Sequence, residues 1–168
     1  MGAPDHRASA RAVQSVPYVV LTVSDSRTEA TDESGRLVRG LFDGAGHALV
    51  DHELVRNVPQ AIQAAVRRFL QGPALCLVTT GGTGAGRRDV TIETVAPCVE
   101  KELPGFGELF RRLSYEEIGN AAMLSRALCG VSRGKVICCL PGSEAAVRLA
   151  LSRLLLPELP HLVWVASR

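Results

Sequence analysis

Short apolar runs alternate with longer amphipathic stretches along most of the chain. Four runs rich in Val, Leu and Ile predict strands, at 18–23, 47–55, 74–79 and 135–140. Apolar side chains that recur every three or four residues predict helices over 37–45, 62–70 and 147–155. Because the strand runs are apolar throughout, we expect a mostly parallel sheet covered by helices on both sides. The predicted fold is a three-layer α/β/α sandwich of the α/β class.

The chain predicts one folded domain behind a short tail. Residues 1–16 have no hydrophobic periodicity beyond a few scattered apolar positions and are expected to be a flexible tail. Neither an internal repeat nor a long linker divides residues 17–168, which we expect to form a single domain.

Several boundaries follow from proline, glycine and capping residues. Pro59 suits the first position of a helix, and Thr91 is the expected cap of another. Between 97 and 130 the pattern is weaker: the Pro-Gly-Phe-Gly segment from Pro104 interrupts a helix, and residues 114–119 fit a helical turn or a loop. We expect residues 120–129 to be helical. The last apolar run, 161–166, fits either an edge strand or a docked helix.

Composition narrows the possible partners and location. With 46% hydrophobic and 21% charged residues, the 168-residue chain resembles an ordinary globular protein. Lys and Arg exceed Asp and Glu by only 19 to 17, so we expect neither a nucleic-acid nor a membrane partner. The apolar runs are shorter than the ~20 residues of a membrane helix, and the start lacks the apolar core of a signal peptide. We expect a soluble, cytoplasmic protein.

The five cysteines and four histidines predict no catalytic or metal site. The cysteines lack metal-ligand spacing, and adjacent Cys138 and Cys139 should point to opposite faces of a strand. Buried free thiols are the better interpretation. No nucleophile motif accompanies the histidines, so we assign them no catalysis.

Polar loops follow each predicted strand. Ligands of open parallel sheets bind at the carboxyl ends of strands, where loops and helix N-termini present free amide groups. The candidate loops are 24–26, 56–57, 80–89 and 141–143. A site assembled from several of them suits a ligand with more than one anionic group, and phosphate is the natural choice.

The strongest motif is Thr-Thr-Gly-Gly-Thr-Gly at residues 79–84. Glycines after a buried strand let the backbone turn sharply and approach a ligand, and threonine hydroxyls add donors. We therefore expect Thr80, Gly81, Gly82, Thr83 and Gly84 to cradle an anion. The spacing fits neither the dinucleotide fingerprint nor the P-loop. The alternative is a turn that only connects a strand to a helix.

Asp89 lies just before a predicted helix rather than at its cap. A carboxylate beside a phosphate cradle suits Mg²⁺, which binds one or two carboxylates together with phosphate oxygens and water. A salt bridge from Asp89 to a neighbouring arginine is an equally good interpretation. Two further groups of residues are candidates either for ligand binding or for capping their own loops. They are Ser24, Asp25 and Ser26, and Pro141, Gly142 and Ser143.

Several linked motifs together carry a family resemblance. They are Thr-Val-Ser-Asp-Ser at 22–26, Thr-Thr-Gly-Gly-Thr-Gly at 79–84, Arg-Asp-Val-Thr at 88–91, Pro-Gly-Phe-Gly at 104–107, Ser-Arg at 125–126 and Leu-Pro-Gly-Ser at 140–143. In order and spacing they resemble the molybdopterin adenylyltransferase family of the MogA/MoaB type, which is related to the gephyrin G domain. Residues 114–119 and 125–127 resemble the MoaB branch more closely.

The resemblance implies an α/β/α domain, assembled as a homotrimer or homohexamer, that binds molybdopterin. In active members it implies AMP transfer from Mg-ATP to the terminal phosphate of molybdopterin, with release of pyrophosphate. It assigns Mg²⁺ and phosphate chemistry to Asp89, the pterin cradle to Gly81–Gly84, and the lining of the site to Ser24, Asp25 and Ser143.

Two positions depart from the family pattern. Active members typically have Asp where this chain has Asn57, and many have Pro where this chain has Glu144. A non-catalytic molybdopterin-binding or scaffold member of the family is therefore the alternative. A third possibility is another phosphate-ligand enzyme of this fold, such as the domain fused to nicotinamide-nucleotide deamidases, although the linked Pro-Gly-Phe-Gly and Ser-Arg segments argue against it.

Overall fold

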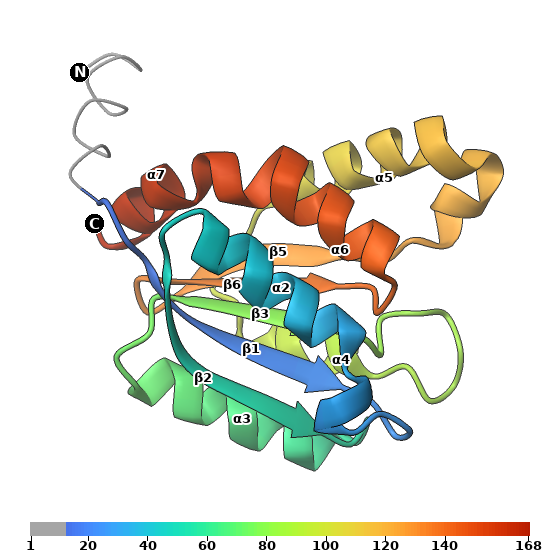
Figure 1. Cartoon of the computed structure of the whole chain (residues 1–168), viewed down its shortest axis with the longest axis horizontal. Coiled ribbons are helices and arrows are strands. Elements are labelled where there is room, and N and C mark those ends of the chain that lie inside the picture. The colour runs from blue at the N-terminus through green and yellow to red at the C-terminus, as the bar shows by residue number, and fades with distance from the viewer. Residues whose placement is uncertain (1–12) are drawn as a thin grey trace.

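A computed structural model describes residues 13–168, and the greater part of the expected tail, residues 1–12, lies outside the described residues. The described residues form one sheet with helices on both faces (Figure 1). Its strands are β1 (Pro17–Val23), β2 (Ala48–Val55), β3 (Cys76–Thr80), β4 (Lys101–Glu102), β5 (Leu128–Ser132) and β6 (Lys135–Leu140). The α-helices are α2 (Glu33–Gly44), α3 (Pro59–Gln71), α4 (Thr91–Val95), α5 (Pro104–Ile118), α6 (Glu144–Ala150) and α7 (Leu156–Ala166). Short 3₁₀ segments are η1 (Glu29–Thr31), η2 (Ala96–Cys98) and η3 (Gly119–Leu124), and η4 (Leu151–Leu155) is a π-helical segment between α6 and α7.

The strand order is β2-β1-β3-β6-β5-β4. The first three pairings are parallel, whereas β5 pairs antiparallel with β6 and β4 pairs antiparallel with β5. The carboxyl ends of β1, β2, β3 and β6 therefore share one edge of the sheet. This mostly parallel, three-layer architecture confirms the predicted fold class.

Two cores separate the layers. On one face, α2, α5, α6 and α7 pack against alternate strand residues such as Val20, Val78 and Cys138. On the other face, α3 and α4 pack against the intervening residues, including Leu21 and Cys139. Figure 1 shows α2, α6 and α7 over one side of the strands and α3 and α4 on the other. The predicted opposite orientation of the two adjacent cysteines is confirmed, and burial raises the pKa of the Cys139 thiol to about 12.

The amino-terminal end of the described chain belongs to the packed domain. Val16 is fully buried, and its amide group donates to His47 Nδ1 at 3.2 Å. Two residues on, the Tyr18 hydroxyl donates to Asp43 Oδ1 at 2.7 Å, which joins the start of β1 to the end of α2. Packing therefore starts slightly before the expected domain boundary.

Three expectations about local structure are corrected, and one open alternative is resolved. Pro104 does not interrupt a helix but opens α5 at its first position, where a missing amide hydrogen is harmless. Residues 120–129 are not one helix, because they contain most of η3 and the start of β5. The cap before α4 is Val90, and Thr91 is the first helical residue. The carboxyl-terminal run resolves as helix, in α7.

The continuous run Glu144–Ala166 is long and apolar enough, by length and composition, to cross a membrane. The apolar strand runs are too short to cross a membrane, and they gave no indication of this longer helical run. Its buried side chains lie in the core against the sheet, as in core helices of globular proteins: Val147, Leu149, Ala150, Leu151, Leu155, Leu159 and Val163.

Candidate functional site

A cleft of about 420 Å³ opens beyond the carboxyl ends of β3 and β6. Four segments form its walls: the loop after β3, the loop after β6, helix α6, and the stretch from the end of α5 through η3 to Arg126. The lining residues that the sequence singled out are Gly81, Gly82, Thr83, Gly84, Asp89, Pro141, Gly142 and Ser143. The structure thus brings two separate predicted loops together in one cavity.

The loop after β3 is held by hydrogen bonds that leave its amide groups available. The Gly81 amide donates to Leu140 O at 3.0 Å. Thr91 binds the two carbonyls that follow, because its hydroxyl donates to Gly81 O and its amide donates to Gly82 O, each at 2.9 Å. Within residues 13–168, the amides of Gly82, Thr83 and Gly84 donate no hydrogen bond. Three donors of one loop are therefore free to bind an anion.

Glycine is required at the start of this loop. Gly81 and Gly82 have φ of +94° and +65°, which side chains other than glycine rarely adopt. An added Cβ on Gly81 would also lie 2.3 Å from Val23 O, so the backbones of β1 and β3 touch there. A turn that only connects a strand to a helix requires neither this backbone strain nor this close approach to β1.

Arg126 fastens the far end of the glycine loop. Its guanidinium donates to Gly84 O at 3.0 Å and forms an ion pair with Glu93 of α4. The hydrogen bond from Arg126 holds the pKa of the Glu93 carboxyl below its ordinary range. One side chain therefore joins the glycine loop to the start of α4, and it also lines the cleft.

Asp89 lies in the cleft with its carboxylate against the glycine loop. Its Oδ2 accepts the Gly86 amide at 3.2 Å. A Cβ added to Gly84 would lie 2.7 Å from the same oxygen, so glycine leaves room for the carboxylate. The described residues contain no cluster of three or more His, Cys, Asp or Glu suited to a metal ion. A single open carboxylate nevertheless fits Mg²⁺ that arrives with a phosphate ligand, because phosphate oxygens and water supply the remaining ligands.

The loop after β6 closes the opposite wall. Ser143 caps α6 by accepting the Ala146 amide at 3.3 Å, as the capping interpretation of this tripeptide predicts. A Cβ added to Gly142 would come within 3.3 Å of Gly81 Cα, so the two loops lie almost in contact. Because the loops after β3 and β6 lie so close together, they line one site rather than two.

Other predicted residues lie outside the cleft lining. The Ser24 hydroxyl accepts the amides of Ser26 and Arg27, which caps its own loop. Asp25 accepts the Asn57 amide at 3.0 Å and lies 3.8 Å from Arg56 Nε, so it ties two neighbouring loops together. Ligand contact by Ser24, Asp25 and Ser26 stays a prediction.

Thr80 also differs from expectation. Its side chain is fully buried, and its hydroxyl donates to Ser34 Oγ at 3.0 Å. The structure therefore places Thr80 beneath the glycine loop rather than in the cleft.

The two departures from the family pattern occupy different surroundings. Asn57 Oδ1 is buried without a hydrogen-bond partner among the described residues and lies 2.8 Å from where a Cβ on Gly82 would be. Glu144 lines a neighbouring hollow with Glu117, Arg148 and other residues, whereas Ser143 and Ala145 on either side of it line the cleft. Asn57 is thus the departure that lies against the glycine loop.

Sequence reasoning from patterns missed one wall of the cleft. It consists of residues from α5, η3 and the segment after them: Ser114, Glu117, Ile118, Ala121, Leu124, Ser125 and Arg126. The signal that pointed toward it was the Ser-Arg pair at 125–126, which entered only through the family resemblance. Hydrophobic periodicity does not show that this segment folds back over the sheet edge.

Comparisons with known proteins agree with this geometry. A family described as "Probable molybdopterin binding domain" matches residues 19–161. The chain is 46% identical to molybdenum cofactor biosynthesis protein B of Bacillus cereus over 94% of this chain and 95% of that protein.

Solved structures give the same result. A crystal structure of a molybdenum cofactor biosynthesis protein B is 46% identical, covers 90% of this chain and 96% of its own, and superposes with a TM-score of 0.88. The tungsten cofactor synthesizing protein MoaB from Pyrococcus furiosus is 36% identical, covers 92% and 99%, and has a TM-score of 0.84. This chain therefore belongs to the molybdopterin-binding-domain family of molybdenum cofactor biosynthesis proteins and is related to its MoaB members.

Proposed function

We propose that the protein binds molybdopterin in this cleft and transfers AMP from Mg-ATP to its terminal phosphate, releasing pyrophosphate. The observation that carries the proposal is that Asp89 lines one cavity together with Gly82, Thr83 and Gly84, whose amides donate no hydrogen bond within residues 13–168. Attack of one phosphate on another needs anionic groups held together while negative charge develops. Catalysis would come mainly from positioning and from neutralising that charge.

The residues divide these tasks by chemistry. The amides of Gly82, Thr83 and Gly84 are suited to bind phosphate oxygens and orient them. Arg126 adds a positive charge at the wall and holds the Gly84 carbonyl by a hydrogen bond. Asp89 would hold Mg²⁺, which when bound neutralises phosphate oxygens and orients the leaving pyrophosphate. Asn57 offers a neutral amide oxygen near Gly82, where a carboxylate would hold a cation more strongly.

The test is single-turnover chemistry with molybdopterin and Mg-ATP, in which adenylylated pterin and pyrophosphate are followed by mass spectrometry. Asp89→Asn keeps an oxygen for the Gly86 amide but removes the charge, so we expect product to fall at least about 100-fold. Asp51→Asn is the matched control, because Asp51 is exposed on β2, outside the cleft, and should leave the rate unchanged.

A second candidate function is molybdopterin binding without turnover, and Asn57 is the observation that favours it. Parent protein that binds molybdopterin but forms no pyrophosphate at any Mg²⁺ concentration would establish this function instead. Absence of both binding and product would refute the proposal as a whole.

We also propose that the protein assembles as a homotrimer or homohexamer in the cytoplasm. Large apolar side chains are exposed on α5 and η3, at the wall of the cleft and beside it: Tyr115 at 59%, Ile118 at 55%, Met123 at 79% and Leu124 at 61%. Exposed clusters of this kind are typical of protein interfaces. Light scattering of Met123→Glu should show smaller particles than parent, whereas Val165→Glu on α7 should not. Fractionation of cells tests the location.

A further inference from the structure

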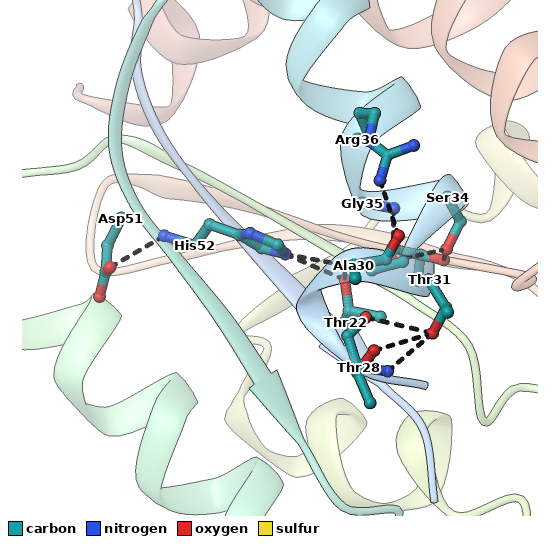
Figure 2. Close-up of polar contacts among 11 residues, drawn as sticks. Thr22, Thr28, Ala30, Thr31, Ser34, Gly35, Arg36, Asp51 and His52 are labelled. Carbon is teal, nitrogen blue, oxygen red and sulfur yellow. Dashed lines mark hydrogen bonds and ion pairs between the residues drawn. The ribbon is translucent and has the colours of Figure 1, made fainter. Parts of the chain in front are cut away.

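A buried polar network lies next to the start of the glycine loop, and none of its residues lines the cleft. Thr22 Oγ1 of β1 donates to Asp32 Oδ2 at 2.6 Å, and His52 Nε2 of β2 lies 2.9 Å from the same oxygen. Ser34 Oγ is 3.4 Å from Asp32 Oδ1 and accepts the Thr80 hydroxyl at 3.0 Å. Figure 2 shows His52 reaching from its strand toward Thr22 and the first turn of α2. The network therefore joins the ends of β1 and β3 and the middle of β2 to the start of α2.

The direction of each hydrogen bond is set by the charge of Asp32. This residue is 2% exposed, and burial alone would raise the pKa of its carboxyl. The Thr22 hydroxyl, the Gly35 amide and His52 outweigh burial and lower that pKa below 3.8. A carboxylate only accepts hydrogen bonds, so Thr22, His52 Nε2 and Ser34 donate to it, and Thr80 in turn donates to Ser34. Each buried polar hydrogen in the network is thereby oriented.

The network ends beside the first glycine of the cradle. Thr80 directly precedes Gly81, and Thr22 directly precedes Val23. The backbones of Gly81 and Val23 approach each other closely, as the position of Val23 O shows. Fixing the two threonines therefore fixes both sides of this contact, from which the glycine loop begins.

We infer that Ser34 and Asp32 are positioning residues that hold the glycine loop in its ligand-binding geometry through Thr80. This inference rests on the proposed function for its ligand, although the loop geometry itself can be measured without one. Neither residue lines the cleft, so both act through Thr80 and the end of β1 rather than by touching the ligand. Without the hydrogen bonds of Ser34 and Asp32, the free amides of Gly82, Thr83 and Gly84 would no longer be held in position to bind the same ligand.

The central variant is Ser34→Ala, which removes the acceptor of the Thr80 hydroxyl. Tyr18→Phe is the matched control, because it removes another buried tether between β1 and α2, at the opposite end of the sheet. Both variants should lower the melting temperature by a few degrees. Only Ser34→Ala should raise the Kd for molybdopterin, by about 10-fold, since catalytic and binding groups tolerate little displacement.

Two more variants separate positioning from stability. Ser34→Thr keeps the hydroxyl and should restore parent affinity. The double variant Ser34→Ala with Thr80→Val leaves no buried donor unpaired, so its stability should return toward parent while its affinity stays low. Recovery of stability and affinity together would show a role in stability only and would overturn the inference.

Amide hydrogen exchange in unliganded protein makes the result independent of the reaction, measured at the two bonded amides of the loop: Gly81, which donates to Leu140 O, and Thr91, which donates to Gly82 O. Exchange there should be faster in Ser34→Ala and in the double variant than in parent or Tyr18→Phe. Unchanged exchange would overturn the inference even if the parent forms product. Faster exchange in a protein that neither binds molybdopterin nor forms product would instead refute the proposed function and leave the positioning role standing.

Discussion

Replacing Gly81 by alanine tests the close contact between β1 and β3 most directly. The change has two separable effects, a strained backbone at φ +94° and a collision of the new Cβ with Val23 O at 2.3 Å. A non-glycine residue in the left-handed region costs about 1–2 kcal/mol. Moving a packed backbone to relieve the collision adds roughly 1–3 kcal/mol. We expect Gly81→Ala to lower the free energy of unfolding by about 2–5 kcal/mol.

Two other glycines separate these contributions. Gly46 has φ +83° but open space where a Cβ would be, so Gly46→Ala should cost only the ~1–2 kcal/mol of strain. Gly40 lies within α2, away from neighbouring atoms and without positive φ, so Gly40→Ala should stabilise the protein by about 0.5–1 kcal/mol. The three substitutions share one chemical change and differ in what surrounds it.

Thermal and urea unfolding followed by circular dichroism measure all three. At roughly 2–4 °C per kcal/mol, Gly81→Ala should unfold about 4–20 °C below parent and clearly below Gly46→Ala. Equal stability of Gly81→Ala and Gly46→Ala would show that the collision with Val23 does not exist and would refute this account of the contact.

Three further predictions address the loop, the network and the metal. Arg126→Ala should weaken molybdopterin binding about 10-fold by freeing Gly84, and calorimetry that finds unchanged affinity would contradict this. Because the folded-state pKa of Asp32 is lowered, its contribution to stability is present above pH ~4 and is lost as pH falls through the folded-state value. Urea unfolding between pH 2 and 5 should therefore show a shallower loss of stability with acid in Asp32→Asn. Asn57→Asp should increase Mg²⁺-dependent product formation, and a Mg²⁺ titration showing no gain would exclude a cation site beside Gly82.

Hydrophobic patterning predicted the parallel part of the sheet because its strands are runs rich in Val, Leu and Ile, which are largely buried in β1, β3 and β6 and partly exposed in β2. It failed between 97 and 130, where β5 contains a glycine and β4 has only two residues, so neither forms a distinct apolar run. Pro104 was misinterpreted because proline both ends and begins helices, and only the following residues decide between the two.

The site was predicted as far as local chemistry specifies it. Gly81 and Asp89 could be singled out because a glycine pair after a buried strand and a carboxylate outside the expected helix cap are visible in a short motif, and their contacts with a ligand stay predictions. Thr80 could not be placed, because its partner Ser34 is far away in sequence and close only after α2 packs on β1 and β3. Asp32 was overlooked for the same reason, since its partners come from β1, β2 and the start of α2.

The strand order also affects how the chain is made on the ribosome. β1, β2 and β3 pair with one another once residue 80 has emerged, but β6, which covers the other edge of β3, ends only at Leu140. At roughly 5–20 residues per second, translation leaves that edge uncovered for about 3–12 s. An uncovered apolar strand edge is a template for pairing with other chains. The Gly81 amide can donate its hydrogen bond to Leu140 O only when this interval ends. The nascent chain is therefore expected to need protection from aggregation until its glycine loop can form.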